Sequence, residues 1–244
     1  MSSAQMSLLP PFIPTRGSAQ VLGGLFLFTA AISWIAVGYD FAEVRLVSAL
    51  SAGAPVETAE RLAHKLTGRW VGWFQIFCIG TTGIAFLVWL HRVRVNVRAL
   101  GVRRLRYGRE WTVLGFLIPV LNALRPYQVV TEIWKASDPS TGDPMAWKSL
   151  RASRLVWLWW MAFLAYIALE IFSATLLDFS VGLERIRFAH ILGMTADVNA
   201  ALSASLAYFV VAHISEAQDR KRATWGRGVA PSNAQPFDPR DAVA

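Results

Sequence analysis

The chain has 244 residues, of which 55% are hydrophobic and only 16% charged, and its mean hydropathy is +0.40. This composition excludes an ordinary soluble domain and predicts a polytopic, all-α membrane protein. The net charge of +8 would suit nucleic-acid binding, but no zinc-finger spacing, basic zipper or aromatic RNA motif accompanies it. Cys78 is the single cysteine and lies in an apolar run, which excludes an internal disulfide.

Four apolar runs, taken in chain order, predict four transmembrane helices. After a polar N-terminal segment (1–18) they cover about 20–38, 70–90, 155–177 and 196–214, within one membrane domain of residues 19–214. The polar connections 40–69 and 178–195 are each predicted to hold a short extracytoplasmic amphipathic helix, near 57–66 and 183–191. Residues 215–244 form a basic tail whose composition indicates disorder.

The segment 111–134 differs from the four runs. Its apolar core, Trp111 to Leu124, is 14 residues long, about 21 Å as a helix, whereas crossing a bilayer takes about 20 residues. Pro119, Asn122 and Pro126 then interrupt the core with a helix breaker, a polar amide and a second breaker. We therefore predict a Pro-broken re-entrant or interfacial segment.

The distribution of basic residues fits four crossings. With both termini in the cytoplasm, 18 of the 24 Lys and Arg residues lie inside and 6 outside, as the positive-inside rule expects. This predicts a multi-pass protein of an inner membrane, with both termini in the cytoplasm. Seven arginines follow the second run and could bind anionic lipid headgroups or simply reflect this topology: Arg92, Arg94, Arg98, Arg103, Arg104, Arg106 and Arg109.

Several short stretches carry a family resemblance. They are Trp89 to Asn96, Ala99-Leu100-Gly101, Trp111 to Asn122, and Arg125-Pro126-Tyr127-Gln128 with Glu132 to Ser137. Together they resemble the bacterial membrane family catalogued as domain of unknown function 4328, strongly over 85–137 and on to about residue 218. The resemblance implies a multi-helix membrane domain and brings no activity, ligand or catalytic residue with it.

Two polar positions are candidate sites, each with a structural alternative. Glu170 lies inside the third predicted helix, where a carboxylate is costly and marks a proton or ligand site by default. Its structural alternative is a protonated Glu170 hydrogen-bonded to a serine of similar depth. Asn122 could line a cleft in the cytoplasmic leaflet or satisfy carbonyl groups freed by Pro119.

The four histidines occupy matching places in two helical hairpins, which indicates either a parallel repeat or two hairpins built from the same few residue types. The pairs His64/His190 in loops and His91/His213 at helix exits could ligate haem in a four-helix bundle. The chain has no CxxCH haem-attachment motif, GxSxG or HExxH.

These features favour a non-enzymatic protein without a cofactor, most simply a structural or accessory subunit of a larger membrane complex. The first alternative is a small transporter or lipid-handling protein that uses Glu170 and the Asn122 region. The second alternative is the haem-binding redox bundle. Membrane lipids and other membrane subunits are the expected partners, and nucleic acid is not.

Overall fold

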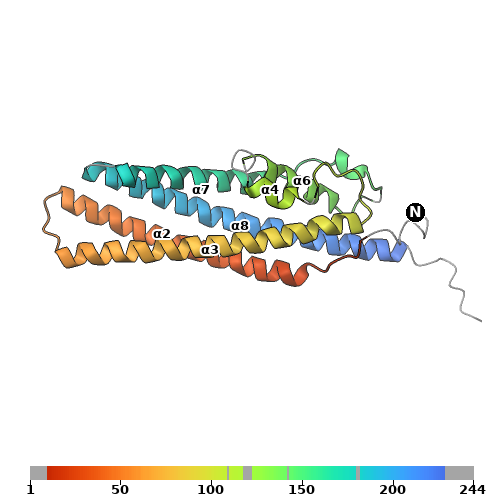
Figure 1. Cartoon of the computed structure of the whole chain (residues 1–244), viewed down its shortest axis with the longest axis horizontal. Helices are drawn as coiled ribbons and strands as arrows, with labels where there is room; N and C mark the ends of the chain where they lie inside the picture. The colour runs from red at the N-terminus through yellow and green to blue at the C-terminus, as the bar shows by residue number, and fades with distance from the viewer. Residues whose placement is uncertain (1–9, 109, 118–122, 142, 180–181, 229–244) are drawn as a thin grey trace, which may run out of the picture.

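The computed structural model describes residues 10–108, 110–117, 123–141, 143–179 and 182–228, and these residues form helices and loops without strands. Four long helices lie along a common axis: α2 (Arg16–Ser51), α3 (Thr58–Ala99), α7 (Arg154–Phe179) and α8 (Leu183–Gly228) (Figure 1). Each is long and apolar enough to cross a membrane. Each of the four predicted apolar runs thus lies in a helix that could cross a membrane.

The long helices extend well past the predicted apolar runs. At 1.5 Å per residue the 42 residues of α3 measure about 63 Å, roughly twice the thickness of a bilayer core. The predicted amphipathic helices near 57–66 and 183–191 are not separate elements but the first turns of α3 and α8. The prediction of a disordered tail is wrong for residues 215–228, which continue α8 without a break.

The bundle has two unlike ends. At one, which we call the hairpin end, α2 ends at Ser51 close to the start of α3 at Thr58, and α7 ends at Phe179 close to the start of α8 at Leu183. At the other, which we call the capped end, α4 (Trp111–Leu117), α6 (Arg125–Ala136) and the short helix η1 (Ala146–Ser149) lie between α3 and α7 in the chain (Figure 1). Helix α3 stops there because Gly101 takes a positive φ of 72°, which turns the chain out of the helix.

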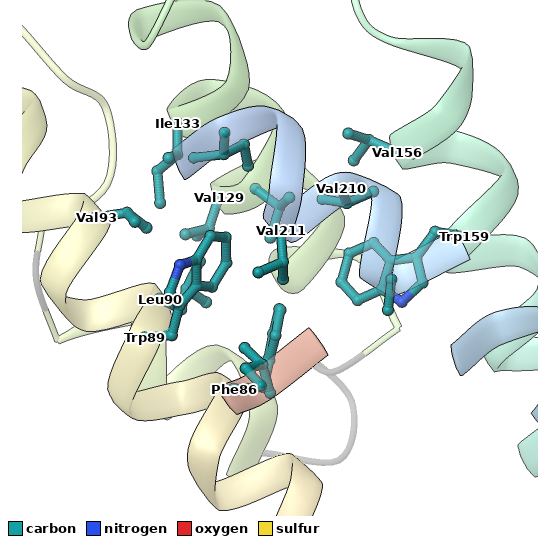
Figure 2. Close-up of a cluster of buried hydrophobic side chains, with 14 of the residues drawn as sticks. Phe86, Trp89, Leu90, Val93, Val129, Ile133, Val156, Trp159, Val210 and Val211 are labelled. Atoms are coloured by element: carbon teal, nitrogen blue, oxygen red, sulfur yellow. The ribbon is translucent and has the colours of Figure 1, made fainter. Parts of the chain in front are cut away.

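The tightest core lies at the capped end (Figure 2). Val129 and Ile133 of α6 are fully buried and lie with Trp89, Leu90 and Val93 of α3 in one apolar cluster. Val156 and Trp159 of α7 and Val210 and Val211 of α8 complete that cluster. Helix α6 is therefore buried inside the protein and is not an exposed helix on its surface. Together with α4 (Trp111–Leu117), we call it the α4–α6 wedge. The amphipathic pattern of its sequence serves this internal packing.

Polar side chains tie the N-terminal segment into the same end. The Asn96 amide accepts a hydrogen bond from the Ile13 N–H at 2.8 Å and donates to the Ile13 carbonyl at 2.7 Å and to Gln218 Oε1 at 3.2 Å. Gln218 in turn donates to the Val93 carbonyl and to the Ser137 hydroxyl. The N-terminal segment and the end of α8 therefore meet at one end of the bundle, as an even number of crossings requires.

The tryptophans of the long helices differ in exposure. Trp89 and Trp160 are 1% exposed and form part of the core, which places them inside the bundle and away from lipid. Trp70 and Trp73 are 75% and 66% exposed on the hairpin half of α3 and point out of the bundle. Only the second pair has the placement expected of an aromatic belt.

Helix α8 is the central element of the bundle. It packs along α2 on one side and α7 on the other, and these are the two most extensive interfaces in the described structure. Helix α3 packs mainly on α2 in the hairpin half and joins α4, α6 and α8 as well. The α4–α6 wedge fills the space beside α3 at the capped end only. In the described structure α3 and α7 make almost no direct contact, which leaves a space between them beyond α4 and α6.

Candidate functional site: an apolar cleft

An apolar cleft of about 380 Å³ occupies this unfilled space, and all four long helices and α4 line it. Its walls are mostly aromatic and small aliphatic residues: Phe26 and Thr29 of α2; Ile79, Gly80, Thr82, Gly83, Ile84, Phe86 and Leu87 of α3; Phe116 of α4; Trp159, Trp160, Phe163 and Tyr166 of α7; Ala200, Ser203, Ala204 and Ala207 of α8. This volume falls in the range of roughly 300–1,000 Å³ that is usual for small-molecule sites.

Small residues create the cleft. On α3, a Cβ atom added at Gly80 or Gly83 would meet no other heavy atom within 4 Å, so both glycines border open space. On α8, three alanines stand at helical spacing along the cleft wall: Ala200, Ala204 and Ala207. Because these side chains are short, they leave the space between α3 and α7 open, whereas larger side chains at the same positions would fill it.

The polar atoms of the cleft wall are few and partly satisfied. Thr29 and Thr82 hydrogen-bond to each other through their hydroxyls at 2.9 Å, which joins α2 to α3 across the wall. A wall of this kind offers no charged group to a ligand and favours hydrocarbon. Acidic side chains lie farther along the bundle, toward the hairpin end.

Two histidine–carboxylate pairs lie at the hairpin end. His190 Nδ1 of α8 is 2.9 Å from Asp40 Oδ1 of α2, and His64 Nδ1 of α3 is 2.8 Å from Glu43 Oε1 of α2. Both histidines were predicted in loops, but each lies within a long helix and is partly buried. The two pairs connect α2 to α8 and to α3. They also provide partners for the acidic residues that α2 carries beyond its apolar run.

Asp197 is a buried acid that the sequence analysis missed. It lies two residues inside the fourth predicted crossing, is 5% exposed, and accepts a hydrogen bond from the Gln75 amide of α3. The sequence does contain a signal for this site, because Asp197 is an acid within the fourth predicted crossing, residues 196–214. Asp197 directly follows the polar connection 178–195, however, and so resembles a residue of that connection. This hydrogen bond links α8 to α3 near the hairpin end of the cleft.

Glu170 occupies a different environment from the predicted one. Its side chain is exposed on α7, and in the described structure it makes no hydrogen bond to a serine. Two serines of similar depth do not contact it: Ser205 donates to the Ala201 carbonyl, and Ser33 is fully buried without a hydrogen-bond partner among the described residues. Glu170 does interact electrostatically with Asp40 and Asp197, so the three carboxylates share one region.

The remaining predicted site residues lie at the capped end or outside the described structure. Pro126 is buried in the first turn of α6, where a missing N–H costs nothing. His213 stacks on Trp134 with ring centroids 3.9 Å apart. Pro119 and Asn122 lie outside the described residues. Within those residues, no group of three or more His, Cys, Asp or Glu side chains is placed to hold a metal ion.

The basic cluster is not uniformly available to lipid headgroups. Arg94 is fully buried and pairs with Glu132 of α6 at 3.9 Å, so it must be removed from the predicted set of headgroup contacts. Arg92, Arg98, Arg103, Arg104 and Arg106 are exposed, and Arg109 lies outside the described residues. The difference follows from helical spacing, because Arg94 shares the inward face of α3 with Leu90 and Val97.

Four helices that are long and apolar enough to cross a membrane are typical of a polytopic α-helical membrane protein. Within that class, the chain belongs to the family described as Domain of unknown function (DUF4328), which matches residues 53–216. The match covers α3, the α4–α6 wedge, α7 and most of α8, and so includes three of the four long helices that line the cleft. No curated protein and no solved structure matches the chain.

Proposed function

We propose that the protein is a non-catalytic membrane protein that holds the hydrocarbon chain of a lipidic ligand in the cleft between α3 and α7. The observation that carries this proposal is the cleft itself, which is apolar, about 380 Å³ in volume and lined from five helices. This geometry favours the lipid-handling alternative over the accessory-subunit role, because close-packed bundles have few voids larger than a water molecule.

The position of the cleft along the long helices favours a ligand that enters from the bilayer. It is lined by the apolar parts of the long helices, and the exposed large residues beside it, such as Ile84 and Val88 on α3 and Ile167 on α7, suit contact with acyl chains. For comparison, an apolar cavity of about 150 Å³ binds one benzene molecule. A single alkyl chain therefore fits the cleft better than a two-chain lipid does.

The test is photolabelling of the full chain in phosphatidylcholine nanodiscs with a dodecyl probe that carries a diazirine. The expected labelled peptides contain residues 79–87 of α3 and 159–166 of α7. Gly83→Phe should remove most of this labelling, because the new ring enters open space in the cleft without displacing protein atoms. Loss of a helical glycine should also stabilise the fold by about 0.5–1 kcal/mol.

The matched control is Gly72→Phe on the same helix. Gly72 also has no heavy atom within 4 Å of an added Cβ, but it does not line the cleft. Labelling of cleft peptides should stay at the wild-type level in this variant. Equal labelling in wild type and both variants, or labelling spread evenly over the lipid-facing surface, would contradict the proposal.

A second candidate, a subunit of a membrane complex, is favoured by the hairpin half of α3. There Trp70, Trp73, Phe74, Ile76 and Phe77 are all at least 47% exposed, while the helix packs mainly on α2. A partner helix could cover this aromatic face. Purification in mild detergent followed by mass spectrometry tests the idea: a stoichiometric partner that is lost on Phe77→Ala supports it, and a protein that arrives alone contradicts it.

The distribution of basic residues between the two ends of the bundle supports one orientation of the protein in the membrane. We place the capped end in the cytoplasm of a bacterial cell, because most of the basic residues lie at that end, and the hairpin end on the opposite side of the inner membrane. The exposed arginines of the capped end are then available to anionic headgroups. Reaction of single cysteines placed at Ala54 and Ser140 with an impermeant maleimide on intact cells tests this orientation. Only the first should react.

A further inference from the structure

A second hollow lies at the capped end, in a groove of about 540 Å³ between the start of α2 and the second half of α8. These two helices share the most extensive interface in the described structure (Figure 1). The groove is separate from the apolar cleft, because no residue lines both. Its lining residues therefore belong to a site of their own.

Small side chains open the groove, and three alanines line it: Ala19, Ala212 and Ala223. Its inner end is closed by Tyr208, whose ring lies 3.0 Å from the place that a Cβ atom on Gly23 would take. Because α2 and α8 run antiparallel from this contact, Arg16 lies at about the level of Ser215. Both residues line the groove.

The groove changes from apolar to charged along its length. Its inner end, at Tyr208 and Ala212, belongs to the apolar run 196–214 of α8. Its outer part is lined by Glu216, Asp219 and Arg220, which follow that run. A membrane boundary at the end of the run places the groove at the level of the lipid headgroups.

Two basic and two acidic side chains line the groove, and they are only partly paired. Arg220 Nη2 lies 3.1 Å from Glu216 Oε1 in an ion pair along α8. Within the described residues, neither Arg16 nor Asp219 forms an ion pair. The groove therefore offers an unpaired guanidinium and an unpaired carboxylate, and its lining carries no net charge.

Two hydroxyl groups add hydrogen-bond donors. Ser215 is 4% exposed and accepts the Trp89 indole N–H at 3.0 Å, while its own hydrogen has no acceptor among the described residues. The half-buried Tyr208 hydroxyl makes no hydrogen bond in that part of the chain. A buried donor without an acceptor is costly, and an anionic oxygen in the groove would satisfy it.

We propose that this groove binds a phospholipid with a phosphoethanolamine headgroup, its phosphate beside Arg16 and Ser215 and its ammonium beside Asp219. The acyl chains then lie along the membrane side of the groove, where Phe209 contacts Tyr208 and is 56% exposed. This inference is independent of the proposed function, because it concerns a different site and a different part of a lipid.

The charges in the groove favour this headgroup over two common alternatives. Arginine matches the geometry of a phosphate, and a primary ammonium donates up to three N–H groups to carboxylates such as Asp219. Phosphocholine carries the same charges but has no N–H to donate. Phosphoglycerol has no cation, so it adds a net negative charge to a neutral groove and leaves Asp219 without a partner.

The test is native mass spectrometry of the full chain released from nanodiscs that hold equal amounts of dioleoyl phosphatidylethanolamine, phosphatidylcholine and phosphatidylglycerol. These lipids share their acyl chains and differ in mass, so the retained lipid reports on the headgroup alone. Phosphatidylethanolamine should be retained about fivefold more than either other lipid, as one solvent-exposed charged contact allows. Soluble glycerophosphoethanolamine should not displace it.

Two variants separate the two halves of the headgroup. Asp219→Asn should abolish the preference for phosphatidylethanolamine over phosphatidylcholine and increase retention of phosphatidylglycerol, because the groove then carries a net positive charge. Arg16→Gln should reduce retention of phosphatidylethanolamine and phosphatidylcholine alike, because both contain the phosphate. The matched controls are Asp178→Asn on α7 and Arg92→Gln on α3, which alter exposed side chains outside the groove and should leave the lipid ratios unchanged.

Three results would overturn the inference. The first is equal retention of the three lipids by wild type, and the second is a preference that survives both Asp219→Asn and Arg16→Gln. The third is displacement by glycerophosphoethanolamine, which would assign the groove to a soluble phosphoethanolamine ester. Labelling of residues 79–87 and 159–166 by the dodecyl probe reports on the cleft alone, so the proposed function and this inference can fail separately.

Discussion

Arg94 and Glu132 form a buried ion pair at the capped end, and the structure predicts unequal costs for removing its two members. Within the described residues, none of the three guanidinium nitrogens of Arg94 has a hydrogen-bond partner, and its contact with Glu132 is 3.9 Å. Glu132 is 5% exposed, and its carboxylate accepts hydrogen bonds from the backbone N–H groups of Arg106 and Tyr107. The carboxylate therefore has two backbone donors of its own, whereas the guanidinium depends mainly on the charge of Glu132, with a smaller contribution from Glu110.

The magnitudes follow from what each substitution leaves behind. Glu132→Ala leaves Arg94 as an uncompensated buried charge, which costs about 3–5 kcal/mol. Arg94→Met keeps a side chain of similar length and leaves Glu132 with its two backbone donors, so the free energy of unfolding should change by no more than about 1 kcal/mol. The double variant should be more stable than Glu132→Ala alone, because it no longer contains the orphaned cation.

Denaturant unfolding in mixed micelles, followed by far-ultraviolet circular dichroism, measures these differences. Arg92→Met is the control, because Arg92 is exposed on the same helix and its loss should change the stability by less than about 0.5 kcal/mol. Equal destabilisation by Arg94→Met and Glu132→Ala would refute the reasoning, as would a double variant that is less stable than Glu132→Ala alone.

Two further substitutions test the packing of the bundle. Asn96→Ala should lower the free energy of unfolding by about 2–4 kcal/mol, because it leaves the buried Gln218 amide and the Ile13 backbone without a partner and frees the N-terminal segment. Asn199→Ala is the control. It removes only a hydrogen bond within α8 and should lower the free energy of unfolding far less in the same assay. Gly68→Ala should destabilise the contact of α2 with α3, because the new Cβ meets the Tyr39 hydroxyl, whereas Gly72→Ala meets nothing and should be neutral or stabilising, as thermal melts in detergent would show.

The number of crossings could be predicted from the sequence, because acyl-chain contact requires long apolar runs and these are visible without a structure. The helix ends could not. Asp40 and Glu43 look like the start of a loop after the first run, but they pair with His190 and His64 on neighbouring helices, and this lets α2 continue to Ser51. Pairings between residues so distant in sequence leave no local signal.

The site was predictable only in part. Glu170 was singled out by its depth in an apolar run, and the structure places it on α7, exposed and without the expected serine. The cleft depends on where the small residues of α3 and α8 lie relative to α7, which is a property of packing. The breaker Pro126 predicted a bend in the chain, but only the structure shows that the helix after it is buried as a wedge.

Native mass spectrometry of the protein released from nanodiscs loaded with the dodecyl diazirine probe shows whether the cleft holds an alkyl chain. Wild type and Gly72→Phe should each retain one tightly bound probe molecule, and Gly83→Phe should retain none. Retention of the probe by Gly83→Phe, or its absence from wild type, would mean that the cleft does not hold an alkyl chain.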